Sequence, residues 1–175
     1  MPFWVRGKPR KMGLNEAWEW IMGTLSRIAS LALAIALALS TAGFAQNKAA
    51  SLERELFDAT NRERLAHGLP ALRWNDALAV AARKHAGEMA HKEALSHQFP
   101  GEPNLPSRVK QAGAHFVWLS ENVAYGPNTS LIHAQFVKSP RHHANILDTD
   151  MNVMGIGIVE RNGQLFVVED FSKAK

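Results

Sequence analysis

Hydrophobic residues follow three patterns along this chain. A continuous uncharged run, IASLALAIALAL, covers residues 28–39. Over residues 51–94 the apolar positions recur every three or four residues, the spacing that places them on one face of a helix. Residues 153–160 and 164–171 are instead rich in β-branched and aromatic side chains, which favour strands. The pattern therefore predicts an apolar N-terminal segment, a helical middle and a terminal pair of strands.

Two long helices are predicted from the helical spacing. The first covers residues 51–67, because Gly68 and Pro70 then end it. The second begins after Asn75, a favourable N-cap residue, and runs to about Ala94. Its core-facing residues are expected to be Leu78, Ala82, Ala86, Met89 and Ala90.

Shorter segments separate the second helix from the strands. Residues 96–106 hold three prolines and a glycine and are expected to form a polar loop. A short helix is predicted over 107–112, followed by an irregular or extended segment over 115–125. A fourth helix covers 128–138 and must end before Pro140, because a residue that precedes proline disfavours the helical conformation.

The chain ends in a predicted β-hairpin. Asn162-Gly163 joins the two strand segments, and this dipeptide is a strong signal for a tight hairpin turn. Helices followed by a terminal antiparallel hairpin favour the α+β class. Two apolar-rich strands also need further elements to cover them. We therefore predict helices on both faces of a small, mainly antiparallel sheet.

The apolar run near the N-terminus has the features of a secretory signal peptide. Arg27 precedes it and the small-residue sequence STAGFAQ follows it. The run is shorter than a membrane span, which needs about 20 apolar residues. We predict a signal peptide with an extended basic segment over residues 1–45, cleaved after Ala45, with Met22 as an alternative start. The competing interpretation is an uncleaved N-terminal anchor.

After cleavage a short linker, residues 46–50, and one domain, residues 51–175, remain. Five of the 20 Lys and Arg and two of the 16 Asp and Glu lie in residues 1–45, which leaves a net charge of +1. These charges alternate in sign and form no basic stripe, so nucleic-acid binding has no support. The chain has no cysteine, which excludes disulfides, thiolate metal ligands and a cysteine nucleophile.

Candidate chemistry is limited to three places. His97 follows the second helix, Glu121 lies in the irregular segment, and His142 and His143 follow the fourth helix. Two imidazoles and one carboxylate suffice to bind Zn²⁺ or another divalent metal with open positions. The same groups could instead form a hydrogen-bonded cluster. Neighbouring residues in the turn expected after Pro140 point in roughly opposite directions, so only one of the two adjacent histidines is expected to face the site.

Five segments, in the same order, resemble the CAP superfamily, also called the SCP-like extracellular domain, in its bacterial form. They are LFDATNRERLAHGLPALRWNDALAVAARKHAGEMA, LSHQFP, SENVAYG, SPRHHANIL and MGIGIVERNGQLFVVEDF. Together they span roughly residues 52–171. The resemblance implies a three-layer α-β-α sandwich and a secreted or cell-envelope protein.

The resemblance also implies which residues line a cleft. His97, Glu121 and His142 match three of the four cleft residues of eukaryotic relatives, in which the histidines can hold a divalent metal. His142 rather than His143 takes the family position, so we expect His142 in the cleft and His143 pointing away. The second family glutamate has no counterpart here, and Ser139 lies near where it would fall.

Three functions are compatible with the sequence. The first is a non-enzymatic secreted module whose cleft binds a divalent metal or a small ligand. The alternatives are a metal-assisted hydrolase of peptide or cell-wall material, with Glu121 as base, and a lipid-binding carrier. The expected partner is accordingly a small ligand, a lipid or an envelope component. We expect Trp74 and Trp118 to be core residues rather than a platform for a ligand. His85, His115 and His133 are expected to be packing or helix-face residues rather than metal ligands.

Overall fold

The computed structural model describes residues 13–174, and these divide into two compact units on either side of the bond between Ala45 and Gln46. In the first unit, helix α1 (Leu14–Ala66) begins at Leu14 and includes the apolar run. Within residues 13–174, no helix is long and apolar enough to cross a membrane. The first twelve residues of the predicted signal peptide lie outside the described residues, and its cleavage stays a prediction.

Residues 46–50 are helical, whereas we expected a short linker there. Helix α1 continues through them and ends at Ala66. The segment QNKAA contains neither proline nor glycine and ends in two alanines, the best helix formers, so nothing in it interrupts a helix. Gly68, with a φ of 75°, then reverses the chain where the sequence predicted the helix to stop.

The second long helix forms where the sequence predicted it. A two-residue strand, β1 (Arg73–Trp74), precedes helix α2 (Asp76–Lys92), and the Asn75 side chain accepts a hydrogen bond from the amide of Leu78. All five residues predicted to face the core on α2 are buried. The short helix α3 (Leu105–Gln111) begins two residues earlier than expected, because Asn104 rather than a later residue caps it.

One of the two remaining segments differs from the prediction. The region expected to be irregular or extended is extended, as the strand β2 (Phe116–Gly126). Helix α4 (Thr129–Lys138) ends as expected, but the residues after it form a further helix, α5 (Pro140–Ile146), instead of a turn. Proline fits the first position of a helix because no backbone hydrogen bond is required there, so Pro140 begins α5 rather than only ending α4.

The hairpin and the fold class are confirmed. Strands β3 (Val153–Arg161) and β4 (Gln164–Ala174) are joined at Asn162 and Gly163, which have φ values of 51° and 72°. Two positive φ angles are the signature of the type I′ turn that the dipeptide predicted. The sheet order is β1-β3-β4-β2, and only β1 and β3 run parallel. The domain is α+β with a small, mainly antiparallel sheet.

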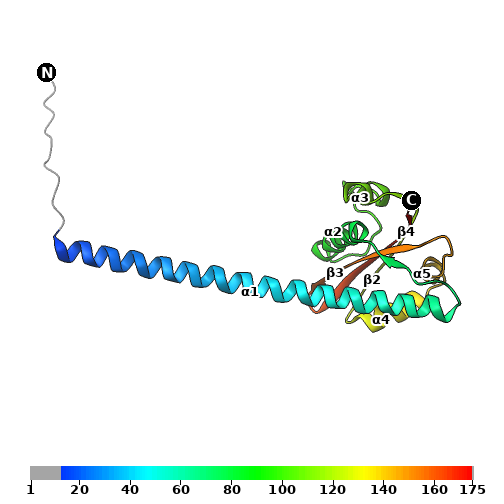
Figure 1. Ribbon diagram of the computed structural model, residues 1–175, viewed down its shortest axis with the longest axis horizontal. Helices are drawn as coiled ribbons and strands as arrows, with labels where there is room; N and C mark the ends of the chain where they lie inside the picture. The colour runs from blue at the N-terminus through cyan, green and yellow to red at the C-terminus, as the bar shows by residue number, and fades with distance from the viewer. Residues whose placement is uncertain (1–12, 175) are drawn as a thin grey trace, which may run out of the picture. The chain divides into compact units, whose positions relative to one another are not determined.

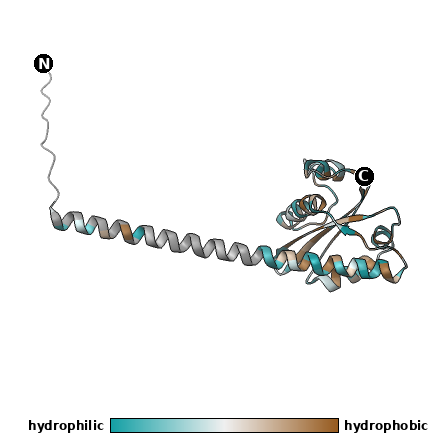
Figure 2. Ribbon diagram, viewed as in Figure 1, coloured by the Kyte–Doolittle hydropathy of each residue, from teal (hydrophilic) through white to brown (hydrophobic). Residues whose placement is uncertain are grey.

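Helices cover both faces of this sheet (Figure 1). Helices α2 and α3 pack on one face, and α4, α5 and the last turns of α1 pack on the other. In Figure 2 the part of α1 after residue 46 alternates between hydrophilic and hydrophobic residues, as a helix with one buried face does. Helix α2 lies directly on β3, since a Cβ atom on Gly155 or Gly157 would come within 2.1 Å of the α2 backbone.

Candidate functional site

Glu121 lies at the centre of the candidate site and is bonded on both sides. Its Oε1 lies 2.8 Å from Nδ1 of His97, which follows α2. Its Oε2 accepts a hydrogen bond from the guanidinium of Arg108 on α3. The side chains of Glu121 and Arg108 are each 3% exposed. The carboxylate is therefore shielded from solvent and held between an imidazole and a guanidinium.

Arg108 also fixes the loop that carries His97. Its Nη1 donates to the carbonyl oxygens of His97, at 2.9 Å, and Pro103, at 3.3 Å. The same side chain thus bonds the loop backbone and the carboxylate that holds the His97 ring. No sequence motif marked Arg108, because an arginine in a short helix usually lies at the surface.

His97 presents one free ring nitrogen. Its hydrogen bond with Glu121 raises the pKa of His97, although partial burial and the charge of Arg108 act against this. The side chain is 64% exposed. Since Nδ1 faces Glu121, and no described group bonds Nε2, the Nε2 atom is the one available to a ligand.

His142 lies on α5, half-buried beside α4. Its ring packs edge-on against Phe136, with a centroid distance of 5.2 Å, and among the described residues it makes no hydrogen bond through the ring. Burial lowers the pKa of His142, and the positive charge of His97 lowers it further, which places the two imidazoles within electrostatic reach of each other. Asn145 on the same helix donates to the backbone carbonyl oxygen of Glu121, at 3.3 Å, so α5 and Glu121 are in contact. That His97, Glu121 and His142 line one cleft stays a prediction.

A pocket of about 450 Å³ opens beside His142. Most of its lining is apolar, and its polar side chains are few. The lining residues besides His142 include Leu95, Val123, Ala124, Tyr125, Phe136 and Gln164. His97 is not among the lining residues, and the pocket extends from His142 toward Gln164 at the hairpin end of the sheet.

Asn122 connects α5 to the sheet. Its side-chain nitrogen donates to the carbonyl oxygen of His142, at 3.2 Å, and to Oε2 of Glu169, at 3.1 Å. Its oxygen accepts from Asn145, at 2.8 Å. Thr60 on α1 donates to Oε1 of Glu169, at 2.9 Å. Complete burial raises the pKa of Glu169 to about 7, despite these two hydrogen bonds to the carboxyl group.

Asp170 is a second buried acid that sequence analysis missed. It is fully buried and pairs in register with Glu121 across β2 and β4, and within the described residues no donor bonds either of its carboxylate oxygens. Burial raises its pKa well above the ordinary value, with the charge of Glu121 adding to the effect. The sequence does carry a signal for this pair, because Glu169 and Asp170 are two successive acids within an apolar strand. Successive strand residues point to opposite faces, and neither face of this strand is exposed, so both acids are buried.

His143 points away from His97 and Glu121. Its Nε2 lies 2.9 Å from Oε1 of Glu63 on α1. The direction is as predicted, but the physical reason differs: successive residues of a helix point about 100° apart, and α5 is a helix. The two adjacent histidines therefore face different neighbours.

Three further expectations have different outcomes. Trp118 is 60% exposed, so its predicted core position is wrong. It lies on the edge strand β2, next to an irregularity in the pairing of β2 with β4. Trp74 packs edge-on against Phe57 at the core. His85 is buried and bonded to Glu102 and to a backbone carbonyl, a packing role as expected.

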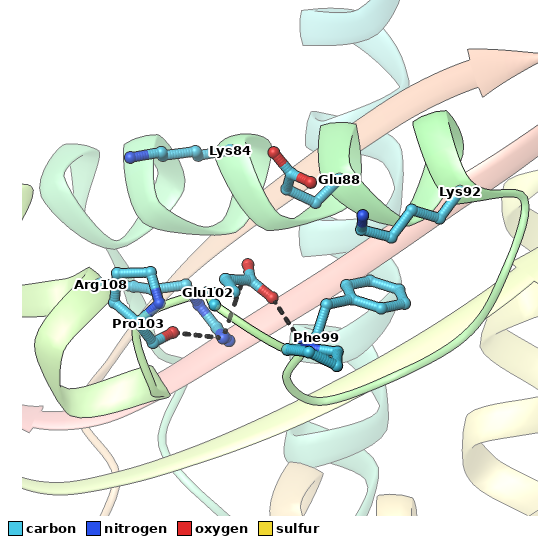
Figure 3. Close-up of a pocket in the computed structure, with 9 residues that line it drawn as sticks. Lys84, Glu88, Lys92, Phe99, Glu102, Pro103 and Arg108 are labelled. Atoms are coloured by element: carbon cyan, nitrogen blue, oxygen red, sulfur yellow. Dashed lines mark hydrogen bonds and ion pairs between the residues drawn. The ribbon is translucent and has the colours of Figure 1, made fainter.

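A second pocket, of about 340 Å³, lies between α2 and the loop that follows it (Figure 3). It contains neither His97, Glu121 nor His142. Figure 3 shows three α2 side chains across from the loop and α3: Lys84, Glu88 and Lys92 face Phe99, Glu102 and Arg108. Glu102 in this pocket is bonded to His85 and to the backbone amide of Phe99. The pocket is therefore separate from the predicted site.

Residues 57–171 match the profile of the CAP family, described as the cysteine-rich secretory protein family. This match covers more than half of the chain, so the chain belongs to the CAP family. The family description mentions cysteines, and this chain has none. Its fold is accordingly held by the packing and buried hydrogen bonds described above.

Three relatives illustrate the likeness. YkwD from Bacillus subtilis is 29% identical over 133 residues, which are 75% of this chain and 52% of YkwD. An extracellular protein containing a SCP domain from Bacillus anthracis has a TM-score of 0.69 at 24% identity, over 74% of this chain and 42% of that one. An outer surface protein from Borrelia burgdorferi has a TM-score of 0.65 at 20% identity, over 70% of this chain and 92% of its own.

The similarities to these relatives support conclusions of different scope. The two solved structures are under 25% identical and support the shared fold alone. The chain spans about half the length of YkwD. Nothing in the comparisons assigns an activity or a ligand, which fold alone does not determine.

Proposed function

We propose that this chain is an exported CAP module, secreted or held in the cell envelope, that acts by binding and not by catalysis. Its ligand is a divalent metal, or a small molecule, held between Nε2 of His97 and the ring of His142. The observation that carries the proposal is the state of Glu121, whose two oxygens are both engaged and whose side chain is 3% exposed.

A hydrolase would need Glu121 as its base, because the sequence offers no other base at the cleft. A general base must reach the proton that it removes, and must have a free oxygen to do so. Arg108 bonds one oxygen and His97 bonds the other. Glu121 is thus suited to orienting the His97 ring.

The donor set fits a divalent transition metal. A metal-binding histidine typically donates its other ring N–H to a carboxylate, which fixes the orientation of the ring. His97 has this arrangement, with Nδ1 on Glu121 and Nε2 free. His142, whose ring makes no hydrogen bond within the described residues, supplies a second nitrogen. Imidazole ligands suit Zn²⁺ and Cu²⁺ better than Mg²⁺ or Ca²⁺.

Export is supported by the sequence and by relatives. The apolar run with its basic flank and small-residue end has the pattern of a signal peptide. The matched proteins from Bacillus anthracis and Borrelia burgdorferi are named extracellular and outer surface proteins. N-terminal sequencing of the exported product should begin at Gln46. A product that retains Trp18 would contradict cleavage after Ala45.

Metal binding is tested by calorimetric titration with Zn²⁺ and Cu²⁺. We expect His97→Ala and His142→Ala to abolish binding at the cleft. Glu121→Gln should weaken it by about 10–100-fold, the usual effect of losing the hydrogen-bond partner of a ligand. His91→Ala, which removes an exposed histidine on α2, is the matched control and should change nothing.

A separate assay decides between binding and catalysis. Peptide, ester and peptidoglycan substrates are incubated with the protein, with and without Zn²⁺. We expect no turnover. Turnover that disappears in Glu121→Gln would replace the proposed function with the hydrolase alternative.

A further inference from the structure

We infer that the chain has a second divalent-metal site, formed by Glu63, His67 and His143 where the end of α1 meets α5. It uses none of the residues of the cleft, so it does not depend on the proposed function. His143 points away from the cleft, and neither Glu63 nor His67 belongs to it.

The three side chains converge from two helices that lie far apart in the sequence. Nε2 of His143 lies 2.9 Å from Oε1 of Glu63, and Nδ1 of His67 lies 3.5 Å from the same oxygen. The two rings meet edge to face, with centroids 5.4 Å apart. Each residue offers one ligand atom, and these atoms all lie within 4.8 Å of one another. A single ion can therefore contact all three without a change in the backbone.

The local structure explains why the site forms. Glu63 and His67 are four residues apart at the end of α1, the spacing that puts two side chains on one helix face. Asn122 ties α5 to the sheet through the carbonyl oxygen of His142. Because α5 is a short helix held in this way, His143 is directed at α1 while His142 is directed at the pocket.

The site is open to solvent and yet partly shielded. The side chains of His67, Glu63 and His143 are 45%, 20% and 25% exposed. An ion can enter from the surface, and the two less exposed ligands hold it in a partly desolvated position where their attraction to it is stronger than in water.

A third imidazole lies beside the cluster. The Nδ1 atom of His133 on α4 is buried and has no hydrogen-bond partner among the described residues. Glu63 and His143 both act electrostatically on the His133 ring, whose pKa is lowered mainly by burial. A buried nitrogen without a partner is unusual in a folded protein. His133 is thus a third imidazole in the neighbourhood of Glu63, in addition to His67 and His143.

The ligand set indicates the kind of metal. Two imidazoles and one carboxylate, with further positions open to water, suit Zn²⁺, Cu²⁺ or Ni²⁺. With neutral imidazoles the three ligands carry one negative charge. A histidine binds a metal through a neutral imidazole, so metal binding at this site competes with protons. Mg²⁺ and Ca²⁺, which prefer all-oxygen ligands, are not expected to bind.

The test uses Zn²⁺ and the full chain in a His97→Ala background, which disables the cleft. Competition against a chromogenic chelator measures stoichiometry and affinity. We expect one equivalent of Zn²⁺ to bind in this background. Adding His67→Ala or His143→Ala should lower the affinity by more than the roughly 10–100-fold that losing a ligand's hydrogen-bond partner costs. Glu63→Gln, which keeps the shape of the side chain, should also weaken binding.

Two controls make the result decisive. His91→Ala in the same background should bind Zn²⁺ unchanged, which excludes general binding by surface histidines. Circular dichroism should show that each variant is folded, as expected for partly exposed positions. No Zn²⁺ binding in the His97→Ala background, or equal binding with and without His67, would overturn the second site. A single equivalent of Zn²⁺ in the wild-type chain that is unchanged by His97→Ala and lost in His143→Ala would count against the proposed function alone.

Discussion

Glu169 makes a measurable link between pH and the stability of this fold. Its side chain is fully buried between Thr60 and Asn122, and its pKa is raised from 4.5 to about 7, chiefly by burial. The informative substitution is Glu169→Gln. In the glutamine the amide oxygen can accept from Asn122 and the amide nitrogen can donate to Thr60, so the variant keeps the hydrogen bonds of the protonated acid.

The sign of the effect follows from proton binding. Below pH 4.5 the group is protonated in both the folded and the unfolded chain. Between pH 4.5 and 7 the unfolded chain loses its proton first, so the free energy of unfolding falls as pH rises. Above pH 7 the folded chain has also lost this proton, and Glu169 lowers the free energy of unfolding no further. Because one pKa unit corresponds to about 1.36 kcal/mol, the rise from 4.5 to about 7 costs the wild type about 3 kcal/mol at alkaline pH.

The assay is urea unfolding of wild type and Glu169→Gln at several values between pH 5 and 8.5. The difference in unfolding free energy between the two proteins should shift in favour of the glutamine by about 2–3 kcal/mol across this range. Other titrating groups are common to both proteins and cancel in the difference. Glu160→Gln, on the exposed part of β3, is the control and should show a flat difference. A flat difference for Glu169→Gln itself would refute the reasoning.

Three further substitutions test other parts of the structure. Gly157→Ala would place a Cβ atom 2.1 Å from the α2 backbone and should lower the free energy of unfolding, measured with heat or urea, by about 3 kcal/mol or more. Gly87→Ala, with open space around its position on α2, should instead stabilise the fold by about 0.5–1 kcal/mol. Equal effects of the two substitutions would contradict the close packing of α2 on β3. Glu121→Gln should lower the pKa of His97 in an NMR titration, because the charged hydrogen-bond partner is lost, and an unchanged value would show that the pair does not form in solution. The guanidinium of Arg64 is fully buried and donates to four backbone carbonyl oxygens. One ammonium group cannot reach all four, so Arg64→Lys should lower the free energy of unfolding in urea by about 3 kcal/mol or more. A loss under about 1 kcal/mol would refute this role of Arg64.

Those elements whose signals are local were predictable from the sequence. The Asn75 cap, the α2 core face and the Asn162-Gly163 turn depend on residues that are neighbours in the chain, and each formed as predicted. Strand β2 was left open between irregular and extended structure, because it is defined by its pairing with the distant strand β4. Helix α5 was not recognised, because it begins with a proline that local rules treat first as a helix breaker.

The candidate site was only partly predictable for the same reason. His97, Glu121 and the two adjacent histidines were candidates from their residue types and positions, and the family resemblance selected His142 over His143. The hydrogen bond between His97 and Glu121 is present in the structure. Arg108, which completes the bonding of Glu121, looks like any surface arginine in the sequence. The convergence of His67 and His143 on Glu63 depends on how α1 and α5 pack, which residue spacing along the chain cannot reveal.

Gly155 and Gly157 contribute no side-chain atom to any site, yet they set the thickness of the domain. Because β3 has no Cβ atoms at these two positions, the backbone of α2 rests on the strand itself. The end of α2 leads directly into the loop that carries His97, so the height of the helix above the sheet also sets the height of that imidazole relative to Glu121 on β2. An engineer who wished to change the span between His97 and the sheet would therefore begin at these two glycines, on the strand beneath, rather than among the residues that bind.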